Sequence, residues 1–221
     1  MYLAGVLAKI VPMLRSSQAV ASIYEAPPQQ QFLPVLPLNS VLYPDGLLPL
    51  RVFEPRYLDL VAQCLRDDDC FVVSLITTGS ETGEAEFHPV GTTAKIVDWD
   101  QGPDRILHVQ CVGERRVRIN DHEVRRNGLC VASVDVLPAP DPVPVPIRHH
   151  RLSDMIAEHL SEIAVYTRDA IRPNDANWLA DRLCEILPLG LTDRQALLEL
   201  DDPLVRLDLL CHLLPAMTRG G

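Results

Sequence analysis

Lysine and aromatic residues are scarce in this chain of 221 residues. Two lysines, Lys9 and Lys95, stand against eighteen arginines, and aromatic residues make up only 5% of the sequence. Hydrophobic residues nevertheless reach 47%, so we expect a full core built mostly from Leu, Val, Ile and Ala. No run of about 18 apolar residues occurs, which predicts that no helix spans a membrane.

Several sequence signatures of catalysis and of metal binding are missing. A phosphate-binding loop needs a lysine directly after a glycine, and the chain has no Gly-Lys dipeptide and no G-x-S-x-G elbow. Its six cysteines form no C-x-x-C pair, so neither a disulfide framework nor a zinc site is predicted. Cys64 and Cys70 flank a turn without a base nearby in the sequence, and we interpret both as structural. We expect no cofactor, and a reducing, cytoplasmic compartment.

The formal net charge of −10 argues against polyanionic partners. Acidic residues are spread over both halves of the chain instead of forming a tail. Phosphate backbones and anionic membranes repel a uniformly acidic surface. We therefore expect neither nucleic acid nor a membrane as the main partner.

Proline-rich segments mark the predicted domain boundaries. A polar spacer, EAPPQQQ, ends a predicted N-terminal extension over residues 1–31. Residues 32–137 read as short strands and turns, which predicts a β-rich unit. Five prolines in nine residues then exclude a helix and predict an extended linker over 138–147. Apolar residues recur at helical spacing beyond it, which predicts a helical unit over 148–217.

Within these units, apolar residues that recur every two residues predict strands, and those that recur about every 3.6 residues predict helices. We expect a helix from Pro55, since proline suits the first turn, and a loop over residues 77–86. Further helices are indicated by Thr192 with Gln195, which match a capping box, and by Asp202 before Pro203. Because proline fixes its own backbone angle, we expect Phe32–Tyr57 to form short strands joined by rigid corners. The predicted strands cover residues 47–53, 71–76, 92–99, 105–112, 115–119 and 129–136.

Three segments, in order, resemble the N-terminal substrate-binding domain of the Lon ATP-dependent proteases. They are Leu36-Pro37-Leu38 through Arg56-Tyr57, then VGTTAKI at 90–96 with VGERRVRI at 112–119, and finally WLAD at 178–181 through PLVRL at 203–207. The resemblance covers residues 32 to about 215. It implies an α+β fold, in which a PUA-like β-barrel is followed by a C-terminal helical bundle. That order agrees with the change of period at 138–147.

The resemblance also implies a function without chemistry. Full Lon proteases carry an ATPase and a Ser–Lys proteolytic dyad, and neither sequence context occurs here. We therefore expect a stand-alone, non-enzymatic module that binds unfolded or misfolded protein segments, or a partner protein, in an apolar groove between barrel and helices. An adaptor role in protein quality control is a further hypothesis.

The predicted peptide- or partner-binding residues are Arg51, Phe53, Glu54, Arg56 and Tyr57. Lon-type domains are thought to bind exposed apolar segments, and these residues would form a recognition rim of apolar and charged side chains. The alternative is a local role, in which Glu54 and Arg56 cap and pair while Phe53 belongs to the core.

Two other functions stay open. Arg115, Arg116, Arg118, Arg125 and Arg126 form a basic cluster that could bind RNA, although acidic residues are interleaved and few aromatics are near to stack bases. An unrecognised hydrolase is the other alternative. His149, His150 and His159 lack the Cys or carboxylate partners of a tight metal site, so we interpret them as polar helix residues and predict no metal.

Overall fold

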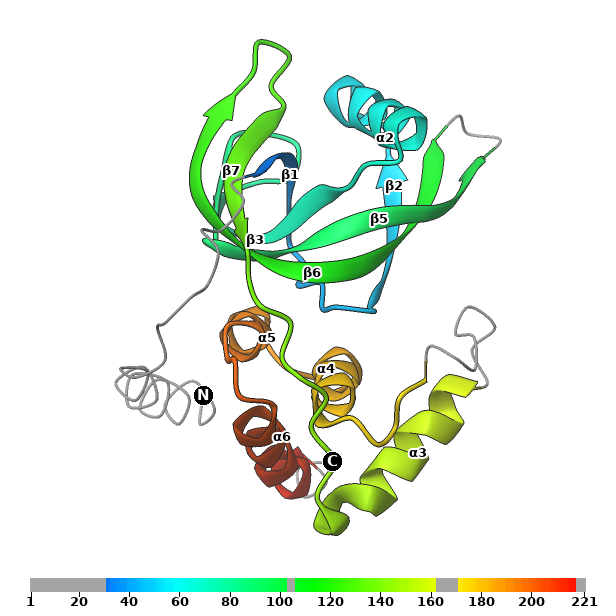
Figure 1. Cartoon of the computed structure of the whole chain (residues 1–221). Coiled ribbons are helices and arrows are strands. Elements are labelled where there is room, and N and C mark those ends of the chain that lie inside the picture. The colour runs from blue at the N-terminus through cyan, green and yellow to red at the C-terminus, as the bar shows by residue number, and fades with distance from the viewer. Residues whose placement is uncertain (1–30, 103–105, 162–170, 218–221) are drawn as a thin grey trace. The chain divides into compact units, whose positions relative to one another are not determined.

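A computed structural model describes residues 31–102, 106–161 and 171–217 (Figure 1). The predicted extension 1–31 therefore lies outside the described residues except for Gln31, as do Arg105 and Ile163. The chain divides into two compact units, the first up to Ala139 and the second from Pro140. The detailed domain limits given above, and the groove between barrel and helices, stay predictions.

The first unit contains seven strands and one helix among its described residues. They are β1 (Gln31–Leu38), β2 (Leu47–Val52), α2 (Pro55–Asp67), β3 (Phe71–Gly79), β4 (Ala85–Phe87), β5 (Val90–Gln101), β6 (Leu107–Val124) and β7 (Cys130–Val136).

The strands form a mostly antiparallel sheet in which hydrogen-bonded pairs run β1–β7–β6–β5–β3. β1 also pairs with β3, in parallel, which returns the circuit to its start (Figure 1). β2 and β4 lie off this circuit, β2 on β6 and β4 on β3. The predicted combination of sheet and helices is present. The barrel is not a clean closed one, because β1 divides its length between β7 and β3, and because β2 and β4 lie outside the circuit.

Prolines lie inside β1 instead of breaking it, which corrects the expected corners. β1 is continuous from Gln31 to Leu38 and includes Pro34 and Pro37. It pairs with β7 over its first half and with β3 over its second half. Among the described strands, each half thus has a partner on one side only, and a proline is tolerated where no neighbour needs its N–H.

Two other predictions about strands were wrong. The strands expected at 105–112 and 115–119 form one 18-residue strand, β6, whose two parts have different partners. The loop expected at 77–86 is shorter, because β3 continues to Gly79 and β4 begins at Ala85. Alternation of apolar and polar residues marks a strand, but it does not show where one partner strand is exchanged for another.

Helix α2 begins at Pro55, as predicted, and lies against the sheet. Its buried residues Leu60, Val61 and Cys64 share one apolar cluster with strand residues that include Phe71 and Val73. Asp68 ends the helix in the left-handed conformation, with φ of 53°. The junction between β2 and α2 is therefore anchored on both sides by buried apolar residues.

The second unit contains helical elements among its described residues. They are the short 3-10 helix η2 (Ile147–His149) and the α-helices α3 (His150–Ser161), α4 (Ala176–Ile186), α5 (Leu191–Leu198) and α6 (Pro203–Met217). α4 contacts α3, α5 and α6, while a C-terminal bundle as such stays a prediction. No helix in the described part of the chain has the length and apolar character needed to cross a membrane.

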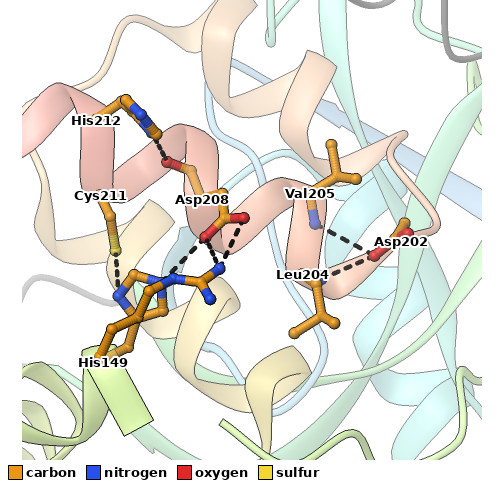
Figure 2. Close-up of polar contacts among 8 residues, drawn as sticks. His149, Asp202, Leu204, Val205, Asp208, Cys211 and His212 are labelled. Atoms are coloured by element: carbon orange, nitrogen blue, oxygen red, sulfur yellow. Dashed lines mark hydrogen bonds and ion pairs between the residues drawn. The ribbon is translucent and has the colours of Figure 1, made fainter. Parts of the chain in front are cut away.

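Of the two helix starts predicted in the second unit, the N-cap at Asp202 is present and the capping box at Thr192 is not. Asp202 accepts hydrogen bonds from the backbone N–H groups of Leu204 and Val205, at 2.9 and 3.2 Å, which confirms it as an N-cap (Figure 2). The capping box at Thr192 is wrong, because α5 already begins at Leu191 and Gly190 occupies the N-cap.

Candidate functional site

A small pocket lies where β2 passes into α2. Its volume is about 70 Å³, far below the roughly 300–1,000 Å³ of small-molecule sites. A single apolar side chain of a peptide fits such a space better than a cofactor does. The pocket is lined by Leu36, Leu38, Leu50, Arg51, Val52, Phe53, Glu54, Tyr57, Glu81 and Thr82.

The pocket has an apolar floor and a polar, exposed rim. Leu36, Leu38 and Val52 are buried members of the apolar cluster beneath α2. Phe53 is 59% exposed, so the interpretation that placed it in the core is wrong. An exposed phenylalanine beside a cavity offers apolar surface to a binding partner without loss of core packing.

Arg56 holds the rim together. Its Nε donates to the Glu54 carboxylate at 3.0 Å, and its Nη1 donates to the Gly128 carbonyl at 2.9 Å. Its Nη2 lies 3.3 Å from the carbonyl oxygens of Glu81 and Gly83. One guanidinium therefore connects the start of α2 with the β3–β4 loop and the β6–β7 turn.

The loop between β3 and β4, which carries Glu81 and Thr82, is also held by a second contact. The Glu81 carboxylate accepts a hydrogen bond of 2.7 Å from the Asn39 backbone N–H. Because Arg56 binds the carbonyl of the same residue, Glu81 is held at both its backbone and its side chain. Glu81 and Thr82 are thus presented to the pocket by contacts far apart in the sequence.

Tyr57 contributes a half-buried ring beside this guanidinium. The Arg56 guanidinium carbon lies 4.6 Å from the ring centroid, within the range of a cation–π contact. Burial raises the pKa of Tyr57, although the charge of Arg56 opposes the shift. The phenol is therefore neutral at physiological pH and can serve as a hydrogen-bond donor.

Four of the five predicted site residues, Arg51, Phe53, Glu54 and Tyr57, line the pocket. Arg56 stabilises the rim through its hydrogen bonds, and its pair with Glu54 matches one half of the predicted local role. The other half is wrong, because the Glu54 side chain makes no capping hydrogen bond at the start of α2. That these five residues bind a peptide stays a prediction. Sequence reasoning missed the lining residues Glu81 and Thr82, because no pattern in the acidic loop indicates that Arg56 holds it.

The other candidate residues do not converge in the same way. Within the basic cluster, Arg115 and Arg118 are exposed but Arg116 is buried. Among the described residues, no group of three or more His, Cys, Asp or Glu side chains is suited to a metal ion. His149 instead contacts Asp208 and Cys211, residues of α6 that sequence reasoning did not connect with it.

The fold is that of a Lon N-terminal domain. The chain belongs to the ATP-dependent protease La (LON) substrate-binding domain family, whose sequence model matches residues 32–216. This confirms the resemblance found in the three motif segments. The domain is the substrate-binding module of that family and not its catalytic domain.

Solved structures and sequence relatives agree with this assignment. The crystal structure of a Lon N-terminal domain protein from Xanthomonas campestris is similar with a TM-score of 0.67 and 36% identity, over 82% of this chain and 98% of that one. The N-terminal domain of the Mycobacterium avium complex Lon protease is similar in fold, with a TM-score of 0.58 and 18% identity, over 81% of this chain and 96% of that one.

Among sequence relatives, Lon protease 2 of Myxococcus xanthus is 29% identical over 195 residues, which is 83% of this chain and 23% of that protein. Protein cereblon of Danio rerio is 33% identical over 123 residues, which is 51% of this chain and 28% of that protein. The chain thus spans only about a quarter of the length of these relatives.

Proposed function

We propose that this domain binds apolar segments of unfolded or misfolded proteins, or of a partner protein, through the pocket between β2 and α2. The observation that carries the proposal is the exposed Phe53 beside a pocket with an apolar floor. Membership of a substrate-binding family supports the same class of ligand. Apolar burial is non-directional, so one surface can accept varied sequences.

The size of the pocket limits what it can recognise. A volume of about 70 Å³ holds one side chain at most, so affinity for a single segment will be modest. The exposed Phe53 ring extends the apolar surface beyond the pocket, and the Arg51 and Glu54 side chains lie at its border. We expect segments that carry one leucine or phenylalanine anchor to bind, and fully polar segments not to bind.

The test is binding of a labelled, permanently unfolded protein, measured by fluorescence anisotropy. Phe53→Ala should weaken binding by about ten- to a hundredfold, because loss of an aromatic contact that becomes buried on binding costs roughly 1.5–3 kcal/mol. Phe32→Ala is the matched control, since Phe32 is also an exposed phenylalanine of the first unit, at 71%, but does not line the pocket. Its binding should stay within about twofold of the unsubstituted chain, below 0.5 kcal/mol.

Two results would contradict the proposal. Equal losses in Phe53→Ala and Phe32→Ala would show that binding does not use the pocket. Salt-sensitive binding of an RNA oligonucleotide, with no affinity for the unfolded protein, would instead favour the RNA-binding alternative. Turnover of peptide or ester substrates would favour the hydrolase.

An adaptor role would follow if the bound segment belongs to a protein destined for degradation. We propose this role on the basis of family membership alone. Crosslinking in cells, followed by identification of the bound proteins, tests it. Repeated recovery of partners without any protease or chaperone would count against the adaptor role, but not against binding of apolar segments.

A further inference from the structure

A cysteine, a histidine and an aspartate lie in line in the second unit. His149 ends η2, whereas Asp208 and Cys211 lie three residues apart on α6 and so share one face of that helix. Figure 2 shows the imidazole of His149 between the Cys211 sulfur and the Asp208 carboxylate. The fold brings these groups together across about sixty positions of sequence.

The distances fit a chain of hydrogen bonds. The Cys211 Sγ lies 3.4 Å from His149 Nδ1, and His149 Nε2 lies 3.0 Å from Asp208 Oδ1. Arg148 Nη2 donates to the same carboxylate at 2.7 Å, while its Nε lies 3.0 Å from His149 Nε2. Thiol, imidazole and carboxylate are thus connected, with one guanidinium at the carboxylate end.

The charge of Asp208 favours one of the two tautomers of the His149 imidazole. Hydrogen bonds from Arg148 and then His149 lower the pKa of Asp208, so this carboxyl is ionised at neutral pH. An ionised carboxylate only accepts hydrogen bonds. When His149 Nε2 donates to it, the Nδ1 lone pair faces the Cys211 thiol. Arg148 Nε is also a donor at 3.0 Å from His149 Nε2 and favours the tautomer in which Nε2 accepts. The Asp208 carboxylate lies at the same distance and carries a full negative charge, so we expect Nε2 to donate to it.

Cys211 needs such a base in order to react. Burial, followed by the charge of Asp208, raises the pKa of the Cys211 thiol, so its resting form carries the proton. The thiolate is the nucleophile in cysteine chemistry. An adjacent base that removes the thiol proton during attack makes a protonated cysteine reactive, as in other cysteine–histidine pairs.

The remaining cysteines provide an internal comparison. All six are free thiols, and Cys64, Cys111, Cys130 and Cys184 are buried. Cys70 is half-buried like Cys211, and burial also raises the pKa of its thiol. Its charged neighbours are Asp69, Glu114 and Arg115. Within the described part of the chain, no hydrogen bond joins the Cys70 thiol to a histidine.

We propose that Cys211 is a site of oxidation by hydroperoxides, with His149 as the base and Asp208 as the residue that positions it. The thiol proton passes to His149 Nδ1 while the sulfur attacks one peroxide oxygen. An S–O bond forms, the O–O bond breaks, and the leaving hydroxide or alkoxide takes the proton back from the imidazolium. The sulfur loses two electrons to the peroxide, and the products are a sulfenic acid and water or an alcohol.

The test is sulfenic acid trapping with dimedone on the full chain. The protein is treated with less than one equivalent of hydrogen peroxide, and the adduct on each cysteine is quantified by mass spectrometry of peptides. Cys211 should be labelled at least about tenfold faster than Cys70, since assistance by a general base typically raises a reaction rate 10²–10⁴-fold. This comparison needs no variant and therefore does not depend on the folding of one.

Variants then separate proton transfer from packing. His149→Gln should reduce the labelling of Cys211 to the rate of Cys70, and Asp208→Asn should reduce it partly. His150→Gln is the matched control and should change nothing, because among the described residues the adjacent His150 side chain hydrogen-bonds the Val145 carbonyl, at 2.9 Å, and not Cys211 or Asp208. If His149→Gln loosened the fold instead, labelling of the buried Cys184 would rise.

Two results would overturn the proposal. The first is equal labelling of Cys211 and Cys70 in the unsubstituted chain. The second is unchanged labelling of Cys211 in a folded His149→Gln variant. Binding of unfolded protein at the first unit is measured separately and does not decide either result.

Discussion

Arg56 illustrates how one residue can shape a site without forming its surface. Four oxygen atoms surround its guanidinium, three of them backbone carbonyls. A planar group with five donors can meet such a set, whereas an ammonium group on a flexible stem cannot. Arg56 therefore matters to binding through the loop that it holds, and Phe53 matters through direct contact.

Arg56→Lys should lower the free energy of unfolding by about 1–2 kcal/mol, because several charge-assisted hydrogen bonds are lost together. The side chain is only 15% exposed, so water cannot fully replace these bonds. Urea denaturation measures the change.

The control for this substitution is Arg66→Lys in the same helix. Arg66 is 70% exposed and pairs with Asp67 at 3.4 Å, so its substitution should change the free energy by less than about 0.5 kcal/mol. Equal unfolding midpoints for the two variants would show that Arg56 does not stabilise the rim.

At the level of single residues, sequence reasoning reached those that are adjacent in the chain and missed those brought together by folding. Arg51, Phe53 and Tyr57 were found because they lie within seven consecutive residues, where β2 ends and α2 begins. Glu81 and Cys211 were missed, since their partners lie 25 and 62 positions away. Periodicity carries no information about such pairs.

At the level of elements, a buried ion pair joins α4 to α6. Arg206 Nη1 lies 2.7 Å from Asp181 Oδ1, and the side chains are 2% and 8% exposed. The two atoms are not aligned as a hydrogen bond, so their contact is chiefly electrostatic. A buried pair of this kind is costly to break, although apolar side chains could replace it.

Asp181→Asn should therefore destabilise the second unit by about 3 kcal/mol, because it leaves the Arg206 charge buried without its counterion. The double substitution Asp181→Leu with Arg206→Met should recover most of this loss. The fluorescence of Trp178, buried in α4, reports unfolding when Trp99 is replaced by Phe. A double variant less stable than Asp181→Asn would contradict this account of the pair.

Element types were more predictable than element limits. The helix from Pro55 and the N-cap at Asp202 follow from local chemistry, and both are present. The continuous β6 was missed because one strand serves two sets of partners. Thr192 failed as a cap because a capping box is only one of several ways to begin a helix.

At the scale of the whole molecule, the chain divides into two compact units between Ala139 and Pro140, while the domain limits inferred from the change of periodicity near 138–147 stay a prediction. Family membership could be predicted from three motif segments, all of which lie within the residues 32–216 that the family model matches. The pocket itself could not be predicted from the sequence, since its lining comes from three separate segments, residues 36–38, 50–57 and 81–82.

The central claim, that apolar segments bind between β2 and α2, is tested most directly by NMR. The backbone amides of the isotope-labelled chain are followed while an unlabelled, leucine-containing unfolded peptide is added. We expect shifts to gather at residues 50–57 and 81–82, with little change along β7. Shifts concentrated at residues 115–126, or no shifts at saturating peptide, would contradict the account.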